Sequence, residues 1–310
     1  MFARLFGKRF ISSALGLGAL GLVGASVYKQ QEQLVFAGGA TSQTNQNGTR
    51  KEPWLRSKNC EKVTSPEKLF ICTGSANRPL AADIAKHLGT TLANAQVGRF
   101  SDGEINIQIK DNIRGKDVYI VQPTCPPVNE NLMELLLLIS TARRASAKQV
   151  TAVVPYYGYA RQDRKTASRV PISAADVAKL LETVGVDRII AMDLHCGQIQ
   201  GFFSPRVPAD NLDGSAVLLE YVIENKTVFS DPNNIVVVSP DAGGVGRAKK
   251  FLERLVARGF SGAGLAMIIK QRKAASEIER MDLVGNVTGK DCLIIDDIVD
   301  TAVRWDKVII

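Results

Sequence analysis

Short apolar runs and amphipathic segments alternate along the chain from residue 69 onward. Apolar or alternating runs predict strands at residues 69–73, 104–110, 118–122, 150–154, 188–194, 235–239, 265–269 and 292–295. Segments with apolar residues at every third or fourth position predict helices at residues 79–88, 131–145, 174–184, 216–223 and 245–257. This alternation is typical of an α/β fold, in which helices flank parallel sheets. The length favours two consecutive α/β units that divide near residue 214.

The first 67 residues have a different character. No acidic residue precedes Glu32, and an uncharged run rich in Gly, Ala, Ser and Leu spans residues 10–28. A basic, acid-poor start favours an organellar presequence, so we expect a mitochondrial or other organellar location, with a cytoplasmic one as the alternative. The run also approaches the ~20 residues of a membrane span, which leaves membrane contact through residues 10–28, or a secretory signal, as alternatives. Residues 37–66 are polar and predict a disordered linker. The expected domains are therefore residues 1–67, 68–214 and 215–310.

The net charge of +8 is concentrated in the first segment. Residues 1–68 hold ten Lys and Arg against four Asp and Glu, which leaves the rest of the chain nearly balanced. Nucleic-acid binding needs a basic face on the folded body, so we expect no nucleic-acid partner. The five cysteines are widely spaced and form no Cys-x-x-Cys pair, which is typical of reduced thiols in a reducing compartment.

The apolar run at residues 292–295 ends in a group of carboxylates. Asp296 and Asp297 follow it directly, and Asp300 and Thr301 come next after two apolar residues. Open parallel sheets bind ligands at the carboxyl ends of their strands, where carboxylates bind hydroxyls directly or through Mg²⁺. A following Asp-Thr turn offers backbone N–H groups to a phosphate. From this stretch alone, a solvated turn is an equally good interpretation.

Two other loops have the composition of a nucleotide site. Phe100 lies beside Asp102 and Glu104, so an exposed ring can stack on a base while a carboxylate accepts from an exocyclic amine. The loop at residues 155–165 combines three tyrosines with Arg161 and two further cations, and arginine binds polyphosphates bidentately. A turn and a solvated loop are the structural alternatives.

Three more loops suggest metal and phosphate chemistry. Asp193 and His195 leave a predicted strand at i and i+2, so both should face one side and share a divalent cation. Asp241 is followed by Ala242 and then by Gly243 and Gly244 at the start of a predicted helix, a setting that suits an anion and a metal. Lys270 and Arg272 follow a predicted strand, where cations neutralise charge on a transferring phosphoryl group. For this basic turn, solvation is again the alternative.

Together these stretches closely resemble the ribose-phosphate pyrophosphokinase family. The resemblance rests on FSDGE at 100–104, NLMELLLLISTARRASA at 131–147, PYYGYARQDRK at 155–165, DLHCGQIQGFF at 193–203, VVSPDAGGV at 237–245, KQR at 270–272 and IIDDIVDTA at 294–302. It implies two phosphoribosyltransferase-like units with parallel sheets flanked by helices, the second of them incomplete. It also implies transfer of the diphosphoryl group of ATP to ribose 5-phosphate, with Mg²⁺ as cofactor, in a homo-oligomer built from dimers that assemble to a hexamer.

The resemblance also implies a role for each matching residue. The residues implied in ATP binding are Phe100, Asp102, Gly103, Glu104, Arg161 and Gln162, the first four acting on a neighbouring subunit. The implied metal ligands are Asp193, His195, Asp210 and Asp241. Lys270 and Arg272 are implied as catalytic, and the residues implied to hold ribose 5-phosphate are Arg272, Asp296, Asp297, Asp300 and Thr301.

The sequence departs from the family pattern at two places. After Phe203 the chain reads Ser-Pro-Arg-Val-Pro-Ala-Asp, in which Asp210 stands in for an aspartate of a shorter family segment. After Ala302 the family continues with Gly-Thr, which closes a phosphate cradle, whereas this chain has Val303 and Arg304 and stops at Ile310. We therefore expect a C-terminally truncated synthetase with an N-terminal extension and with little activity of its own. The alternatives are a non-catalytic synthetase-associated subunit and, ranked lower, a phosphoribosyltransferase of nucleotide salvage.

Overall fold

The computed structural model describes residues 69–225, 227, 229, 231, 233–274 and 277–299, with the backbone alone at 10–11, 27–28, 270–274 and 277–280. The remainder of the predicted presequence and linker, and the predicted site residues Asp300 and Thr301, lie outside the described residues. From residue 69 onward the chain divides between Asp213 and Gly214 into two compact units. No helix within the described ranges has both the length and the apolar character needed to cross a membrane.

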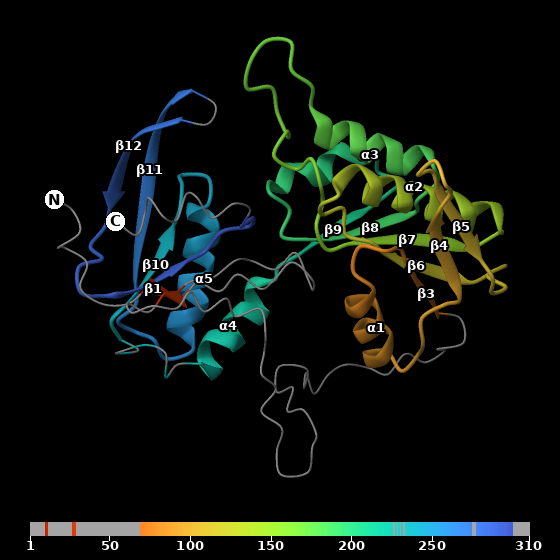
Figure 1. Ribbon diagram of the computed structural model, residues 1–310. Helices are drawn as coiled ribbons and strands as arrows, with labels where there is room; N and C mark the ends of the chain where they lie inside the picture. The colour runs from red at the N-terminus through yellow and green to blue at the C-terminus, as the bar shows by residue number, and fades with distance from the viewer. Residues whose placement is uncertain are drawn as a thin grey trace. The chain divides into compact units, whose positions relative to one another are not determined.

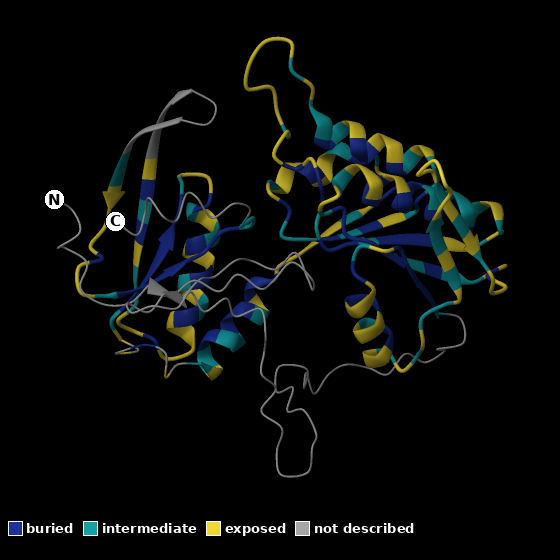
Figure 2. Ribbon diagram, viewed as in Figure 1, coloured by how far each residue is buried: buried dark blue, intermediate teal, exposed yellow. Residues whose placement is uncertain are grey.

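The N-terminal unit is built on a five-stranded, fully parallel sheet (Figure 1). Its order is β3 (Leu69–Thr73), β6 (Asp117–Val121), β7 (Gln149–Val154), β8 (Arg188–Met192) and β9 (Ala209–Leu212). The central strands form because their apolar runs are buried on both faces, as Figure 2 shows. Parallel pairing brings the carboxyl ends of all five strands to one edge, which is where the sequence predicted chemistry.

Helices cover both faces of this sheet. Helix α1 (Arg78–His87) packs on the face that carries Ile71 and Val121, and its first turn is capped by Asn77, whose side chain accepts a hydrogen bond from Leu80 N. Helices α2 (Val128–Arg144) and α3 (Ser173–Thr183) pack with the larger apolar cluster on the other face. These positions follow from the apolar stripe of each helix, which must be buried against a sheet.

One predicted strand lies outside the sheet. The segment predicted at 104–110 forms β5 (Ile105–Ile109), which pairs only with β4 (Ala95–Arg99) in an antiparallel hairpin. Its alternation of Ile with polar residues explains this position, because only one face of the hairpin packs on the core. Its placement as another strand of the β-α-β alternation is therefore wrong. Strands β4 and β9 were not predicted.

The C-terminal unit has β10 (Ile235–Ser239) between β11 (Gly264–Ala274) and β13 (Asp291–Ile294), all parallel. Strand β12 (Glu277–Val284), which was not predicted, pairs antiparallel with β11. Beyond β13 the sheet adds β1 (Phe10–Ile11) and β2 (Val27–Tyr28). Helices α4 (Ser215–Glu224) and α5 (Val245–Ala257) contribute their apolar side chains to a cluster with β10 and β13.

Candidate functional site

The turn between β4 and β5 carries the predicted adenosine-binding residues. Gly103 has a φ of +92°, which closes the turn, and Gly103 N donates to Phe100 O at 3.0 Å. The side chain of Phe100 is 53% exposed, although it is a large apolar group. Asp102 and Glu104 are also exposed, and Glu104 N donates to Asp102 Oδ1 at 3.0 Å. The turn therefore presents an exposed ring beside two exposed carboxylates.

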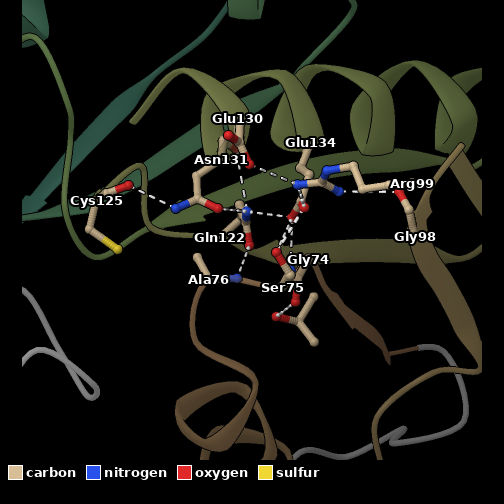
Figure 3. A network of polar contacts seen from close by, with 11 residues as sticks. Gly74, Ser75, Ala76, Gly98, Arg99, Gln122, Cys125, Glu130, Asn131 and Glu134 are labelled. Carbon is tan, nitrogen blue, oxygen red and sulfur yellow. Dashed lines mark hydrogen bonds and ion pairs between the residues drawn. The ribbon is translucent and has the colours of Figure 1, made fainter. Parts of the chain in front are cut away.

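An ion pair with a buried carboxylate holds the base of this turn. Arg99 Nη2 lies 2.7 Å from Glu134 Oε1, and the Glu134 side chain on α2 is fully buried (Figure 3). Glu134 also accepts from Ser75 N at 2.8 Å and from Gln122 Nε2 at 3.0 Å. The hydrogen bond to Glu134 raises the pKa of the Arg99 guanidinium. Sequence reasoning missed this pair, since a carboxylate at one position of an apolar helix is ordinarily solvated.

The loop at residues 155–165 is fixed against its neighbours. Gly158 N donates to Thr124 Oγ1 at 2.6 Å, and a Cβ at Gly158 would lie only 2.7 Å from Thr124 O, so glycine is needed for this close approach. Tyr157 is buried and its hydroxyl donates to Ala174 O at 3.0 Å. These anchors leave Arg161 and Gln162 exposed, and Ser173 donates a hydrogen bond to the Gln162 side chain.

Two of the predicted metal ligands of the N-terminal unit, Asp193 and His195, follow β8, and the third, Asp210, lies on β9. Strand β8 ends at Met192, and Asp193 has a φ of +43°, so the i, i+2 alternation does not continue to His195 and the same-side argument is wrong. Asp193 is half-buried and His195 is exposed. Asp210 lies on β9 opposite Ile190, with its carboxylate 4.0 Å from Arg188 Nε. In the described parts of the chain no three His, Cys, Asp or Glu side chains form a ready metal site.

In the C-terminal unit, carboxylates meet at the ends of two adjacent strands. Asp241 follows β10, and its Oδ1 accepts from Gly244 N at 3.0 Å at the start of α5. Asp296 and Asp297 follow β13, the strand that pairs with β10, and Asp297 N donates to Asp296 Oδ1 at 3.0 Å. Arg247 of α5 lies 3.1 Å from Asp297 Oδ1, a partner that sequence reasoning missed. All three carboxylates were predicted to follow strands, and the structure brings them to the same edge of the sheet, at the carboxyl ends of β10 and β13.

Burial and neighbouring charge act together on Asp296. Its side chain is buried, and burial raises its pKa to about 7, assisted by the hydrogen bond with Asp297 and by the negative charges of Asp297 and Asp241. The ordinary value is 3.8. A hydroxyl-rich or cationic ligand at this edge would therefore meet a carboxylate that changes its protonation near neutral pH.

We expect Asp296→Asn to stabilise the ligand-free protein at pH 8. The folded state binds more protons than the unfolded state between pH 3.8 and about 7, so this group's stability contribution is present below 3.8 and is lost as the pH rises through 7. The variant has no carboxylate to ionise at this position, so its free energy of unfolding should exceed that of the parent by roughly 2 to 4 kcal/mol at pH 8 and by little at pH 4. Urea unfolding at both pH values measures it, with Glu253→Gln on the exposed face of α5 as control. A gain that does not depend on pH would contradict the assignment.

The predicted catalytic cations lie within a strand. Lys270 and Arg272 belong to β11, which continues to Ala274, so their placement in a loop after the strand is wrong. The strand continues because β12 supplies hydrogen-bonding partners, with Lys270 opposite Met281 and Arg272 opposite Ile278. The ladder is irregular between Gln271 and Arg272, as at a β-bulge. The structure describes only the backbone of this stretch.

Family models, curated relatives and a solved structure all point to the same protein family. Residues 69–185 match the model for the N-terminal domain of ribose phosphate pyrophosphokinase, and residues 218–309 match the phosphoribosyl transferase domain. Ribose-phosphate pyrophosphokinases from Helicobacter pylori and Wolinella succinogenes are 51% and 53% identical over 232 residues, which is 75% of this chain and 69% and 71% of those proteins. The crystal structure of phosphoribosylpyrophosphate synthetase from Mycobacterium smegmatis matches with a TM-score of 0.69 and 38% identity, over 78% of this chain and 75% of that one. This chain belongs to the ribose-phosphate pyrophosphokinase family.

Proposed function

We propose that this protein transfers the β,γ-diphosphoryl group of ATP to the 1-hydroxyl of ribose 5-phosphate, giving phosphoribosyl diphosphate and AMP. The observation that carries the proposal is the meeting of Asp241, Asp296 and Asp297 at the ends of β10 and β13. Carboxylates at this edge accept hydrogen bonds from sugar hydroxyls, and hydroxyls are what a ribose presents. Family membership supports the reaction, and Asp300 and Thr301 complete the proposed ribose 5-phosphate site.

The ATP site uses the turn and the loop described above. Phe100 stacks on the adenine, and the carboxylate of Glu104 accepts from its exocyclic amine, while Asp102 and Gly103 shape the turn. Arg161 and Gln162 bind the nucleotide from the anchored loop. Because Phe100 is exposed, a neighbouring subunit of a homo-oligomer would complete its site. Sedimentation as a monomer alone, at micromolar concentration, would count against this arrangement.

Mg²⁺ is the proposed cofactor, and each unit offers candidate ligands for it. In the N-terminal unit Asp193 supplies a carboxylate, the ligand type that Mg²⁺ prefers, and His195 supplies a ring nitrogen; in the C-terminal unit Asp241 supplies a carboxylate. Mg²⁺ bound with ATP would neutralise phosphate charge and orient the diphosphoryl group. Asp210 is the weaker candidate, because Arg188 already lies near its carboxylate. Lys270 and Arg272 would donate to the oxygens on which charge develops during transfer.

A second candidate function follows from Val303 and Arg304. These residues stand where the family has the Gly-Thr that closes the phosphate cradle, so the chain would bind Mg·ATP without completing the reaction. In that role it would be a non-catalytic partner subunit of an active synthetase. Mg·ATP binding by calorimetry, without AMP formation at any ribose 5-phosphate concentration, would favour this role.

The nature of the products tests the proposed reaction, even if turnover is slow. A long incubation of the protein with Mg²⁺, ATP and ribose 5-phosphate should yield AMP and phosphoribosyl diphosphate in equal amounts by ³¹P NMR. The same incubation without ribose 5-phosphate is the control and should give neither. Formation of ADP would indicate transfer of one phosphoryl group only. Release of pyrophosphate from phosphoribosyl diphosphate that depends on an added base would indicate a phosphoribosyltransferase instead.

A further inference from the structure

The hairpin β4–β5 is joined to its unit differently at its two ends. Ile107 and Ile109 of β5 pack against the apolar cluster that includes α2, which holds the far part of the hairpin. At the turn end the side chains of residues 100–104 are exposed. Arg99 is the last residue of β4, directly precedes the turn and lies opposite Ile105. Its ion pair with Glu134 connects the turn end of the hairpin to α2.

The partner of Arg99 is held more rigidly than a surface carboxylate. Glu134 is fully buried on α2 and accepts from Ser75 Oγ at 2.7 Å, besides its bonds from Ser75 N and Gln122. Ser75 follows β3 and Gln122 follows β6, so two strand ends and a helix fix this carboxylate (Figure 3). A Cβ at Gly74 would lie 2.6 Å from Glu134 Oε2, so the backbone also approaches it closely.

We propose that Glu134 is a positioning residue for ATP, which acts through Arg99 to set the direction of the turn at residues 100–104. A carboxylate that is buried with its charge needs a cationic partner, so Arg99 is drawn to one place. The adjacent Phe100 and the turn follow Arg99 because the intervening backbone is short and closed by hydrogen bonds from Phe100 N to Glu104 O and from Gly103 N to Phe100 O. The inference rests on the proposed function, since it assumes that this turn binds adenosine.

A neighbouring carboxylate provides a matched control. Glu130 lies one turn earlier on α2 and 3.5 Å from the same guanidinium nitrogen, but its side chain is 60% exposed. An ion pair with an exposed carboxylate contributes little, whereas loss of Arg99 leaves the buried Glu134 without its cationic partner. Glu134→Gln and Glu130→Gln are the same chemical change on the same helix and differ in burial. Arg99→Met provides a second way to break the pair, at a residue whose side chain is itself 31% exposed.

The experiment measures nucleotide affinity and the order of the turn on the full chain. Calorimetric titration with Mg·ATP should show about tenfold or more weaker binding for Glu134→Gln and for Arg99→Met, since misalignment of binding groups costs one or more powers of ten. Glu130→Gln should stay within about twofold. Amide hydrogen exchange should become faster at residues 100–104 in the first two variants, and stay as in the parent in β6 and β7. Combining Glu134→Gln with Arg99→Met should add little, because both remove one contact.

The outcomes separate this inference from the proposed function. Unchanged Mg·ATP affinity in Arg99→Met, with a parent chain that binds Mg·ATP, would overturn the positioning role while leaving the ATP site in place. Faster exchange at the turn without weaker binding would mean that the pair serves the fold alone and would also overturn it. Failure of the parent chain to bind Mg·ATP would instead overturn the proposed function, and the inference with it. If Glu134→Gln does not fold, Arg99→Met decides the question.

Discussion

Lys270→Ala should lower kcat by roughly a hundredfold or more while Mg·ATP affinity changes only a few-fold. A cation that acts mainly on charge developing in the transition state gives this pattern, because it contributes little to the ground state. The register of β11 places Lys270 opposite Met281, just before the irregular part of the ladder.

Steady-state kinetics and calorimetry on the same preparations measure the two quantities. Lys249→Ala, at an exposed position of α5, is the control and should leave both unchanged. Lys270→Arg, which keeps the charge, should retain part of the turnover. Equal losses in binding and turnover for Lys270→Ala would show that Lys270 binds ATP in the ground state. To secure a measurable rate, the series is made in a chimera that carries the Helicobacter pylori relative's segment from position 300 onward.

The second large effect concerns the phosphate cradle. Replacing Val303 with Gly and Arg304 with Thr should tighten ribose 5-phosphate binding by roughly tenfold. The left-handed backbone conformation costs a residue with a side chain about 1–2 kcal/mol, and 1.4 kcal/mol is a factor of ten in affinity. Glycine lets backbone N–H groups converge on the phosphate dianion, and Thr offers a hydroxyl that Arg304 lacks. These two residues lie outside the described part of the chain.

Calorimetric titration with ribose 5-phosphate measures this change. Val303→Ala is the matched control, since it removes the branched side chain but keeps a Cβ, and it should recover only a small part of the affinity. If Arg304 already binds the phosphate by its charge, the double variant will bind ribose 5-phosphate no more tightly than the parent. That result would show that the cradle does not require the family's Gly-Thr.

The parts of the fold that the sequence predicted are those in which burial decides the conformation. The runs at 150–154, 235–239 and 292–295 are largely buried on both faces, and each lies in an interior parallel strand. Among the strands that were missed, β9 and β12 lie at the edges of their sheets. Strand β9 reads Ala-Asp-Asn-Leu, and β12 carries three acidic residues, so neither has a local apolar signal. Their conformation comes from a neighbouring strand, which a local pattern does not contain.

The same distinction applies to the candidate site. Motifs placed Asp241, Asp296 and Asp297 at strand ends, and the parallel register of β10 and β13 then brought them together. Residues that depend on distant partners were missed. Glu134 is buried with its charge only because Ser75, which is 59 positions away, and Arg99 reach it. The expectation for Asp193 and His195 was wrong in geometry because β8 ends at Met192, before either residue, so strand alternation does not apply to them.

AMP release that depends on ribose 5-phosphate should be compared between this chain and the chimera. If the ATP-binding and transfer residues are those of a pyrophosphokinase, the segment from position 300 onward, which holds Val303 and Arg304, is what limits the reaction. We therefore expect equal Mg·ATP affinity for the two proteins, with AMP release at least about a hundredfold faster in the chimera. Equally fast AMP release by both proteins would contradict this expectation, and so would a chimera that binds Mg·ATP and ribose 5-phosphate but releases no AMP.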